Sequence, residues 1–106
     1  MNPARILVVD DDPRNIRLLD SLLALDGYHV LKATDGLEAC QRVTEDNPDL
    51  VLLDAMMPHM NGFEVCGWIR AQAATALLPV VMVTALNSTE EKVRALETGA
   101  DDFLSK

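Results

Sequence analysis

The sequence predicts an α/β domain built on a doubly wound, five-stranded parallel sheet with helices on its faces. Three short apolar runs carry this prediction, because residues 6–9, 50–53 and 80–83 contain only Ile, Leu, Val and Met. An unbroken run of this kind is typical of a strand that is buried on both faces of a parallel sheet. Segments with helical periodicity separate the runs, and the alternation of strands and helices indicates right-handed crossovers.

The N-terminal half contains two of the strands and two helices. Asp12 and Pro13 follow the first apolar run and suit the N-cap and the first position of a helix that ends before Gly27. A shorter strand is expected over residues 28–33 and a second helix over residues 36–45. The apolar residues at helical spacing are Ile16, Leu18, Leu19, Leu22 and Leu23 in the first helix, and Leu37, Cys40 and Val43 in the second.

The C-terminal half contains the remaining strands and two further helices. One helix begins after Gly62, the next ends at Gly99, and the last strand is expected over residues 102–104. Their apolar positions are Phe63, Cys66 and Ile69 in the first of these helices, and Val93 and Leu96 in the second. Trp68 lies one residue away from the apolar positions of the helix that begins after Gly62, which predicts a solvent-facing ring beside Val65. A partner surface and a surface ring without a partner explain such a residue equally well.

Composition restricts the classes of function. The 106 residues are 49% hydrophobic, which suits a single domain over residues 1–106. A net charge of −8 disfavours direct binding to nucleic acid or to anionic membranes. The sequence shows neither an apolar run of about 20 residues nor a secretory signal, so a cytoplasmic protein is expected. Cys40 and Cys66 lie outside any CxxC or Cys/His cluster, which predicts buried free thiols.

Reactive side chains follow four of the strands at the point where each strand ends. Asp10 and Asp11 follow the first strand, Asp54 follows the third, Thr84 ends the fourth and Lys106 follows the fifth. The carboxyl ends of parallel strands meet at one edge of the sheet, where ligands of such folds bind. These five residues are therefore expected to form one site.

The chemistry expected of this site is phosphoryl acceptance with a metal ion. Two carboxylates about 4 Å apart repel by ~4 kcal/mol at an effective dielectric constant near 20, so three carboxylates need a cation among them. Oxygen ligands of this kind favour Mg²⁺. Asp54 is then expected to act as the nucleophile, Lys106 to neutralise the transferred oxygens, and the Thr84 hydroxyl to donate a hydrogen bond to one of them.

Four segments of the chain resemble the receiver domain of two-component response regulators. They are ILVVDDDP, LLDAMMPHMNG, VVMVTAL and GADDFLSK, and together they span essentially the whole chain. The resemblance implies a flavodoxin-like sheet in the order 2-1-3-4-5 and transfer of a phosphoryl group from a histidine kinase or a phosphotransfer protein to Asp54. It also implies that Asp10, Asp11, Asp54 and the backbone carbonyl of Met56 bind Mg²⁺.

The resemblance further implies a phosphorylation switch made of Thr84 and Phe103, which acts on an output domain or a downstream protein. Phe103 has no hydroxyl, and a plain core phenylalanine is an equal alternative for this position. Such a domain is a signalling module, not an enzyme, although it assists its own phosphorylation and dephosphorylation. Met56 and Leu86 cannot orient an attacking water, so slow dephosphorylation is expected.

Three features depart from the metal-site pattern or from the family pattern. Receivers usually continue past the lysine with a proline, a loop and a fifth helix, so this sequence is expected to be a receiver truncated before that helix, with four helices. Marginal stability and self-association through the uncovered sheet face are expected in consequence. Asp12 is a third acid after the first strand, but we expect it to cap a helix instead of binding metal. His59, where many receivers have glycine, is expected to be exposed and without a role.

Two other classes of protein fit the alternation of strands and helices less well. A flavodoxin-like cofactor module needs a glycine- and hydroxyl-rich loop after the first strand, where this chain has acids that would repel phosphate. A magnesium-dependent phosphohydrolase would share the Asp, Thr, Lys and Mg²⁺ set. Such an enzyme needs a second acid at the position of Met56 and a substrate cap that 106 residues cannot form.

Overall fold

The computed structural model describes residues 3–84 and 89–105, apart from the side chains of Thr84, Glu91 and Ser105. The strands are β1 (Arg5–Val9), β2 (His29–Ala33), β3 (Leu50–Leu53), β4 (Val80–Thr84) and β5 (Asp102–Ser105). The helices are α1 (Pro13–Leu25), α2 (Gly36–Asp46), α3 (Gly62–Ala71), α4 (Thr89–Glu97) and a short 3₁₀ turn, η1 (Ala73–Thr75). Every strand and helix expected from the sequence is confirmed, with bounds that differ by a few residues at most.

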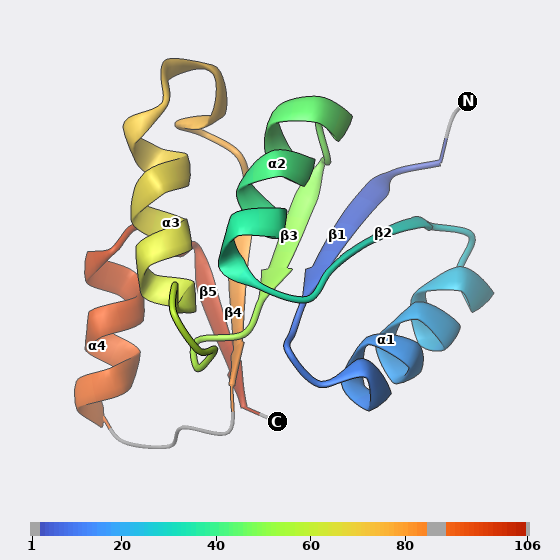
Figure 1. The fold of residues 1–106 in the computed structure, drawn as a ribbon, viewed down its shortest axis with the longest axis horizontal. Coiled ribbons are helices and arrows are strands. Elements are labelled where there is room, and N and C mark those ends of the chain that lie inside the picture. Colours follow the sequence, from blue (N-terminus) through green and yellow to red (C-terminus); the bar gives the residue numbers. More distant parts are fainter. Residues whose placement is uncertain (1–2, 85–88, 106) are drawn as a thin grey trace.

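The strands form one parallel sheet in the order β2-β1-β3-β4-β5, as Figure 1 shows. The flavodoxin-like order is therefore confirmed. Within the described residues, α2, α3 and α4 pack on one face of this sheet and α1 packs on the other. None of the helices in these ranges is both long and apolar enough to cross a membrane.

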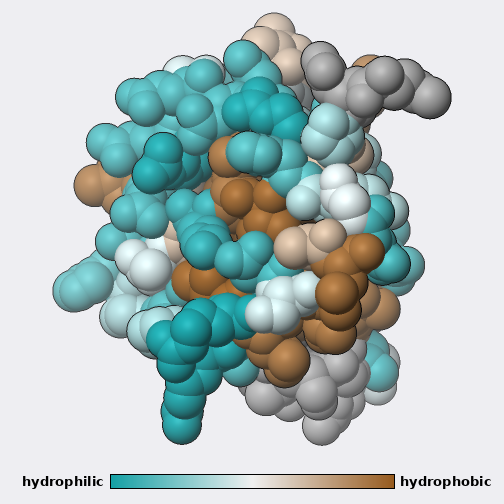
Figure 2. All heavy atoms as spheres, turned by 90° about the vertical axis from the view of Figure 1, so that its right-hand side faces the viewer, coloured by the Kyte–Doolittle hydropathy of each residue, from teal (hydrophilic) through white to brown (hydrophobic). Residues whose placement is uncertain are grey.

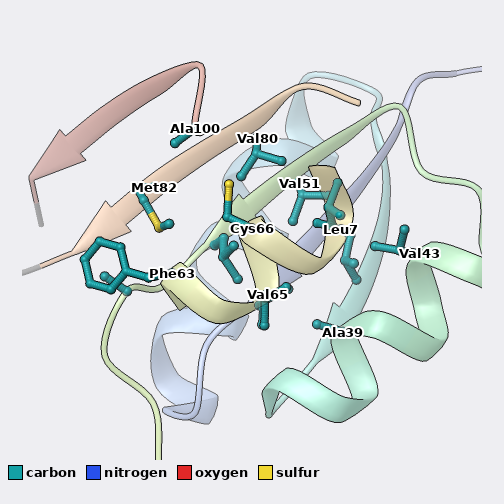
Figure 3. Packing of buried hydrophobic residues seen from close by; sticks show 14 of the residues in the cluster. Leu7, Ala39, Val43, Val51, Phe63, Val65, Cys66, Val80, Met82 and Ala100 are labelled. Carbon is teal, nitrogen blue, oxygen red and sulfur yellow. The ribbon is translucent and has the colours of Figure 1, made fainter. Parts of the chain in front are cut away.

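The larger core lies between the sheet and α2, α3 and α4. Leu7, Val51 and Val80 point to this side from neighbouring strands and are fully buried. Figure 3 shows these strand side chains meeting Val43 of α2 and Cys66 of α3. The alternate residues of the same strands point to the other face, which explains why the runs are apolar throughout.

The smaller core lies between the sheet and α1. Ile6, Val8 and Ile16 are buried there. Leu18 and Leu22 of α1 are exposed, although helical spacing grouped them with the core residues of that helix. Periodicity predicts a broad apolar stripe, but α1 contacts the sheet only along part of that stripe, because no second helix flanks α1 within the described residues.

Trp68 and Val65 of α3 contradict the sequence prediction. Val65 is fully buried, and the Trp68 ring is half-buried and packs against the larger core instead of facing solvent. The reason is that α3 contacts the sheet on one side and α2 on another, so its buried arc is wider than one stripe. Leu37, Val93 and Leu96, placed on apolar stripes by spacing, are exposed.

The two cysteines are buried and free, as predicted. Burial raises the pKa of both thiols above the ordinary value of 9.0. In Cys66 the thiol also donates a hydrogen bond to the carbonyl oxygen of Thr98, at 3.3 Å from Sγ. Both side chains therefore stay protonated at neutral pH and serve packing.

Candidate functional site at the carboxyl edge of the sheet

Asp10, Asp11 and Asp54 meet at the carboxyl edge of the sheet. Val9 of β1 pairs with Leu53 of β3, so the residues that follow these two strands lie side by side. One carboxylate oxygen from each of the three aspartates lies within 4.8 Å of the others. Asp10 is 2% exposed and Asp54 is 5% exposed, whereas Asp11 is open to solvent. The expected acidic cluster is therefore present.

Asp10 is oriented by the beginning of α1. The backbone N–H of Asp12 donates to its Oδ1 at 2.9 Å, and the Asn15 side-chain amide donates to its Oδ2 at 3.2 Å. Its own backbone N–H donates to the carbonyl of Ala33 at the end of β2. Asp10 is thus tied to both β2 and α1.

Asp54 is oriented by the loop that follows it. The Met56 backbone N–H donates to Oδ1 of Asp54 at 3.3 Å, and the Asp54 backbone N–H donates to the carbonyl of Val9. At the far end of the loop, the Gly62 N–H donates to the carbonyl of Ala55 at 3.0 Å. The loop therefore folds back onto Asp54 before α3 begins.

The beginning of α3 stabilises this loop. The Asn61 side chain accepts a hydrogen bond from the Glu64 N–H, and the Glu64 carboxylate accepts one from the Asn61 N–H. This reciprocal capping box satisfies two otherwise free N–H groups at the helix start. Inside the loop, His59 is exposed and adopts a positive φ of 67°.

Asp12 caps α1, as predicted, and lies outside the acidic cluster. Its Oδ1 accepts a hydrogen bond from the Arg14 N–H at 2.9 Å, and its Oδ2 forms an ion pair with the Arg14 guanidinium at 3.0 Å. The pair with Asp12 raises the pKa of Arg14, through the hydrogen bond first and the opposite charge second. The geometry of Asp12 is that of an N-cap.

The three clustered carboxylates fit a divalent cation. Two of them are buried, and like charges at such separations repel strongly in a poorly solvated site. All of the donor atoms are hard oxygens, which suit Mg²⁺ better than a metal that prefers nitrogen or sulfur. The cluster can therefore hold such an ion.

Of four other residues singled out in the sequence, only Phe103 is placed together with its side chain. Thr84 ends β4 and pairs with Ser105 of β5, while its side chain lies outside the described part of the chain. Lys106 and Leu86 are outside the described residues. Phe103 is half-buried, pairs with Met82 in the sheet, and has the Lys92 ammonium 5.8 Å from its ring centre.

Asn15 and Gly62 belong to the site but were not predicted from the sequence. Asn15 is the third residue of α1, and helix side chains point back toward the N-terminus, which would have indicated a contact with Asp10. A Cβ atom on Gly62 would clash with the Asp54 carbonyl oxygen. No sequence pattern indicates that close approach.

A family model described as the response regulator receiver domain matches residues 6–106 of this chain. The chain belongs to this family. Receiver domains of this family are signalling domains of two-component systems, as the resemblance implied.

Curated relatives of this receiver domain are longer than the chain. Response regulator PleD of Caulobacter vibrioides is 47% identical over 103 residues, which are 97% of this chain and 23% of PleD. The DNA-binding dual master transcriptional regulator RpaA of Synechocystis is 41% identical over 102 residues, 96% of this chain and 42% of RpaA. The chain thus spans less than half the length of these relatives.

Solved structures share the fold of this receiver domain closely. The Vibrio cholerae chemotaxis protein CheY4 superposes with a TM-score of 0.93 at 33% identity, covering 98% of this chain and 87% of that one. A putative response regulator from Chloroflexus aurantiacus superposes with a TM-score of 0.94 at 35% identity, covering 98% and 85%. The sheet and helices described above are therefore those of a CheY-like receiver.

Proposed function

We propose that this receiver domain accepts a phosphoryl group on Asp54 from a histidine kinase or a phosphotransfer protein, with Mg²⁺ as its cofactor. The observation that carries the proposal is the buried Asp54 carboxylate beside Asp10 and Asp11, at the carboxyl edge of the sheet. Membership of the receiver family supports this role over that of a phosphohydrolase. The cytoplasm is the compartment that such partners imply.

Four groups would hold the metal ion in this proposal. They are the side chains of Asp10, Asp11 and Asp54, and the backbone carbonyl of Met56. When bound, Mg²⁺ offsets the negative charge of the carboxylates and of the incoming phosphoryl oxygens.

The chain's own residues perform the transfer. One carboxylate oxygen of Asp54 forms a bond to phosphorus while the bond between phosphorus and the donor's histidine nitrogen breaks, and that nitrogen keeps the electron pair. The hydrogen bond from the Met56 N–H orients the Asp54 carboxylate for this attack. Lys106 would neutralise a transferred oxygen, and the Thr84 hydroxyl would donate a hydrogen bond to another.

Phosphorylation would replace the single negative charge of the Asp54 carboxylate with ~1.5 to 2 negative charges on the acyl phosphate, and it would change the surface formed by α4 and β5. Thr84 and Phe103 would act as the switch. The half-buried position of Phe103, next to α4, supports this role. An output domain or a downstream protein would read the change.

Incubation with acetyl phosphate and Mg²⁺, followed by intact mass measurement, tests the proposal. Wild-type protein should gain one phosphoryl group, and Asp54→Asn should gain none. Asp26→Asn, at the C-terminal end of α1, is the matched control and should label like wild type. Equal labelling of wild type and Asp54→Asn would refute the assignment, and repeated turnover of small phosphate esters would favour a phosphohydrolase.

The phosphorylated state should decay slowly. The side chain of Met56 is exposed beside Asp54 but apolar, and the other position from which the family can position water is Leu86. Neither side chain can orient an attacking water. The phosphorylated mass should therefore persist well beyond seconds after acetyl phosphate is removed.

A further inference from the structure

Asn15 contacts the buried carboxylate of Asp10 from the first turn of α1. Its side-chain nitrogen donates to Oδ2 at 3.2 Å, while the Asp12 N–H donates to Oδ1 at 2.9 Å. Each oxygen of Asp10 therefore accepts a hydrogen bond from the segment that immediately follows. Two donors on opposite oxygens prevent the carboxylate from rotating about its Cβ–Cγ bond.

We propose that Asn15 is a positioning residue of the metal site, which holds the Asp10 carboxylate in the orientation that binds the cation. This inference rests on the proposed function, because it assumes that the acidic cluster binds a divalent ion. Outer groups that hydrogen-bond to metal ligands fix the ligand geometry, and their loss weakens metal binding. Asn15 meets the structural requirement for such a group.

The start of α1 holds Asn15 in place. The carbonyl oxygen of Asp12 accepts hydrogen bonds from the backbone N–H groups of Asn15 and Ile16, at 3.1 and 3.3 Å. Ile16 is buried between α1 and the sheet, which sets the rotation of the helix about its axis. The Asn15 side chain therefore faces Asp10 without a rearrangement of the helix.

The chemistry of the amide suits a metal site better than a charged donor would. A lysine or arginine at this position would pair with Asp10 and compete with the metal ion for its negative charge. A carboxamide orients the carboxylate and leaves its charge available to a cation. The identity of the donor thus agrees with the proposed role.

Direct measurement of Mn²⁺ binding to the unphosphorylated protein tests this role. Free Mn²⁺ is counted by electron paramagnetic resonance, with wild type, Asn15→Leu and Arg17→Leu compared at equal protein concentration. Asn15→Leu has nearly the same shape without the donor and should raise the Kd about 10-fold. Arg17→Leu, exposed on the same helix, should leave the Kd unchanged.

The side-chain amide signal of Asn15 provides a second readout that a purely structural role would not move. The signal is assigned by its loss in Asn15→Leu, and it should shift during Mg²⁺ titration of the wild type, while that of Asn47 stays fixed. Equal Mn²⁺ Kd values for wild type and Asn15→Leu would overturn the inference, and so would an Asn15 signal that does not shift when Mg²⁺ is added. Neither result would contradict the proposed metal site itself. Failure of wild type to bind Mn²⁺ would refute the proposed function and this inference with it.

Discussion

Gly62 allows the loop after β3 to pack directly against Asp54. A Cβ atom at this position would lie 2.8 Å from the Cα of Ala55 and would also clash with the carbonyl oxygen of Asp54. Both obstacles are backbone atoms, which cannot move aside as a flexible side chain can. The orientation of the Asp54 carboxylate therefore depends on the absence of a side chain at residue 62.

The Gly62→Ala variant should be strongly destabilised. Backbone displacement to relieve an overpacked contact costs about 1–3 kcal/mol, and Asp54 would shift with it. Gly67→Ala is the matched control, because Gly67 lies in the same helix with open space around its Cα. That change should raise the free energy of unfolding by about 0.5–1 kcal/mol. Urea denaturation measures the free energy of unfolding of both variants, and equal stability of Gly62→Ala and Gly67→Ala would contradict this account.

His59 adopts a backbone conformation that few residues other than glycine favour. Its φ of 67° lies in the left-handed region, in the loop between Asp54 and α3. Asparagine, aspartate and histidine tolerate this region better than β-branched residues do. Histidine at this position therefore causes less backbone strain than a β-branched residue would.

Substitutions at His59 should separate backbone strain from side-chain contacts. His59→Val should lower the free energy of unfolding by about 1–2 kcal/mol relative to His59→Gly, because Cβ branching adds strain in the left-handed region. Both variants remove the imidazole, so their difference contains no contribution from its contacts. Identical urea midpoints for the two variants would show that this loop relaxes freely.

Arg70 joins α3 to the segments that precede β4 and β5. Its guanidinium donates to the carbonyls of Leu78 and Gly99 at 2.6 and 2.8 Å, and pairs with Asp101 at 2.8 Å. The same Asp101 oxygen accepts a hydrogen bond from the Val80 N–H at the start of β4. One side chain thus holds together the ends of β4, α4 and β5 that lie opposite the acidic site.

The Arg70→Met variant should lose about 2–3 kcal/mol of stability, because two carbonyls and a carboxylate lose a charged donor. Arg42→Met is the matched control: it removes an exposed ion pair with Asp46, one turn away on α2. Such pairs contribute about 0.3–0.5 kcal/mol. Guanidinium denaturation measures the free energy of unfolding of both variants. If Arg70→Met loses no more stability than Arg42→Met, the contacts of Arg70 with Leu78, Gly99 and Asp101 are dispensable.

One face of the molecule leaves apolar side chains exposed. We define this α1-side face by Leu18, Leu22 and Leu25 of α1 and Leu104 of β5, all of which are exposed. Leu104 joins it because it pairs with Val83, which points to the same side of the sheet as α1. Figure 2, viewed from the side of α1, shows apolar side chains gathered in the centre and toward the lower right.

This face should make the 106-residue chain self-associate as its concentration rises. Leu22 is 52% exposed, and Leu22→Lys should weaken the association by placing a charge on the face. Leu77 is 93% exposed in the segment before β4, and Leu77→Lys is the control that should leave association unchanged. Sedimentation velocity gives the readout, and a wild type that stays monomeric at every concentration would contradict the expectation.

Three apolar runs predicted β1, β3 and β4, and the acids that follow two of them predicted a shared site at the carboxyl edge of the sheet. A strand with apolar side chains on both faces reads as an unbroken apolar run, so Leu50–Leu53 and Val80 to Val83 are recognisable locally. Parallel strands place their carboxyl ends at one edge of the sheet whatever their order, but Asp10 lies near Asp54 only because β1 and β3 are neighbours. The order of the strands itself came from the family resemblance, because alternation alone leaves it open.

Only the tertiary structure decided which side chains the elements bury and which partners they meet. Trp68 is half-buried because α2 lies against α3, and Leu22 is exposed because α1 has no neighbouring helix on its face within the described residues. Periodicity reflects the average surroundings of a helix or strand. The burial of each of these side chains depends instead on whether packing places a particular neighbouring helix beside it.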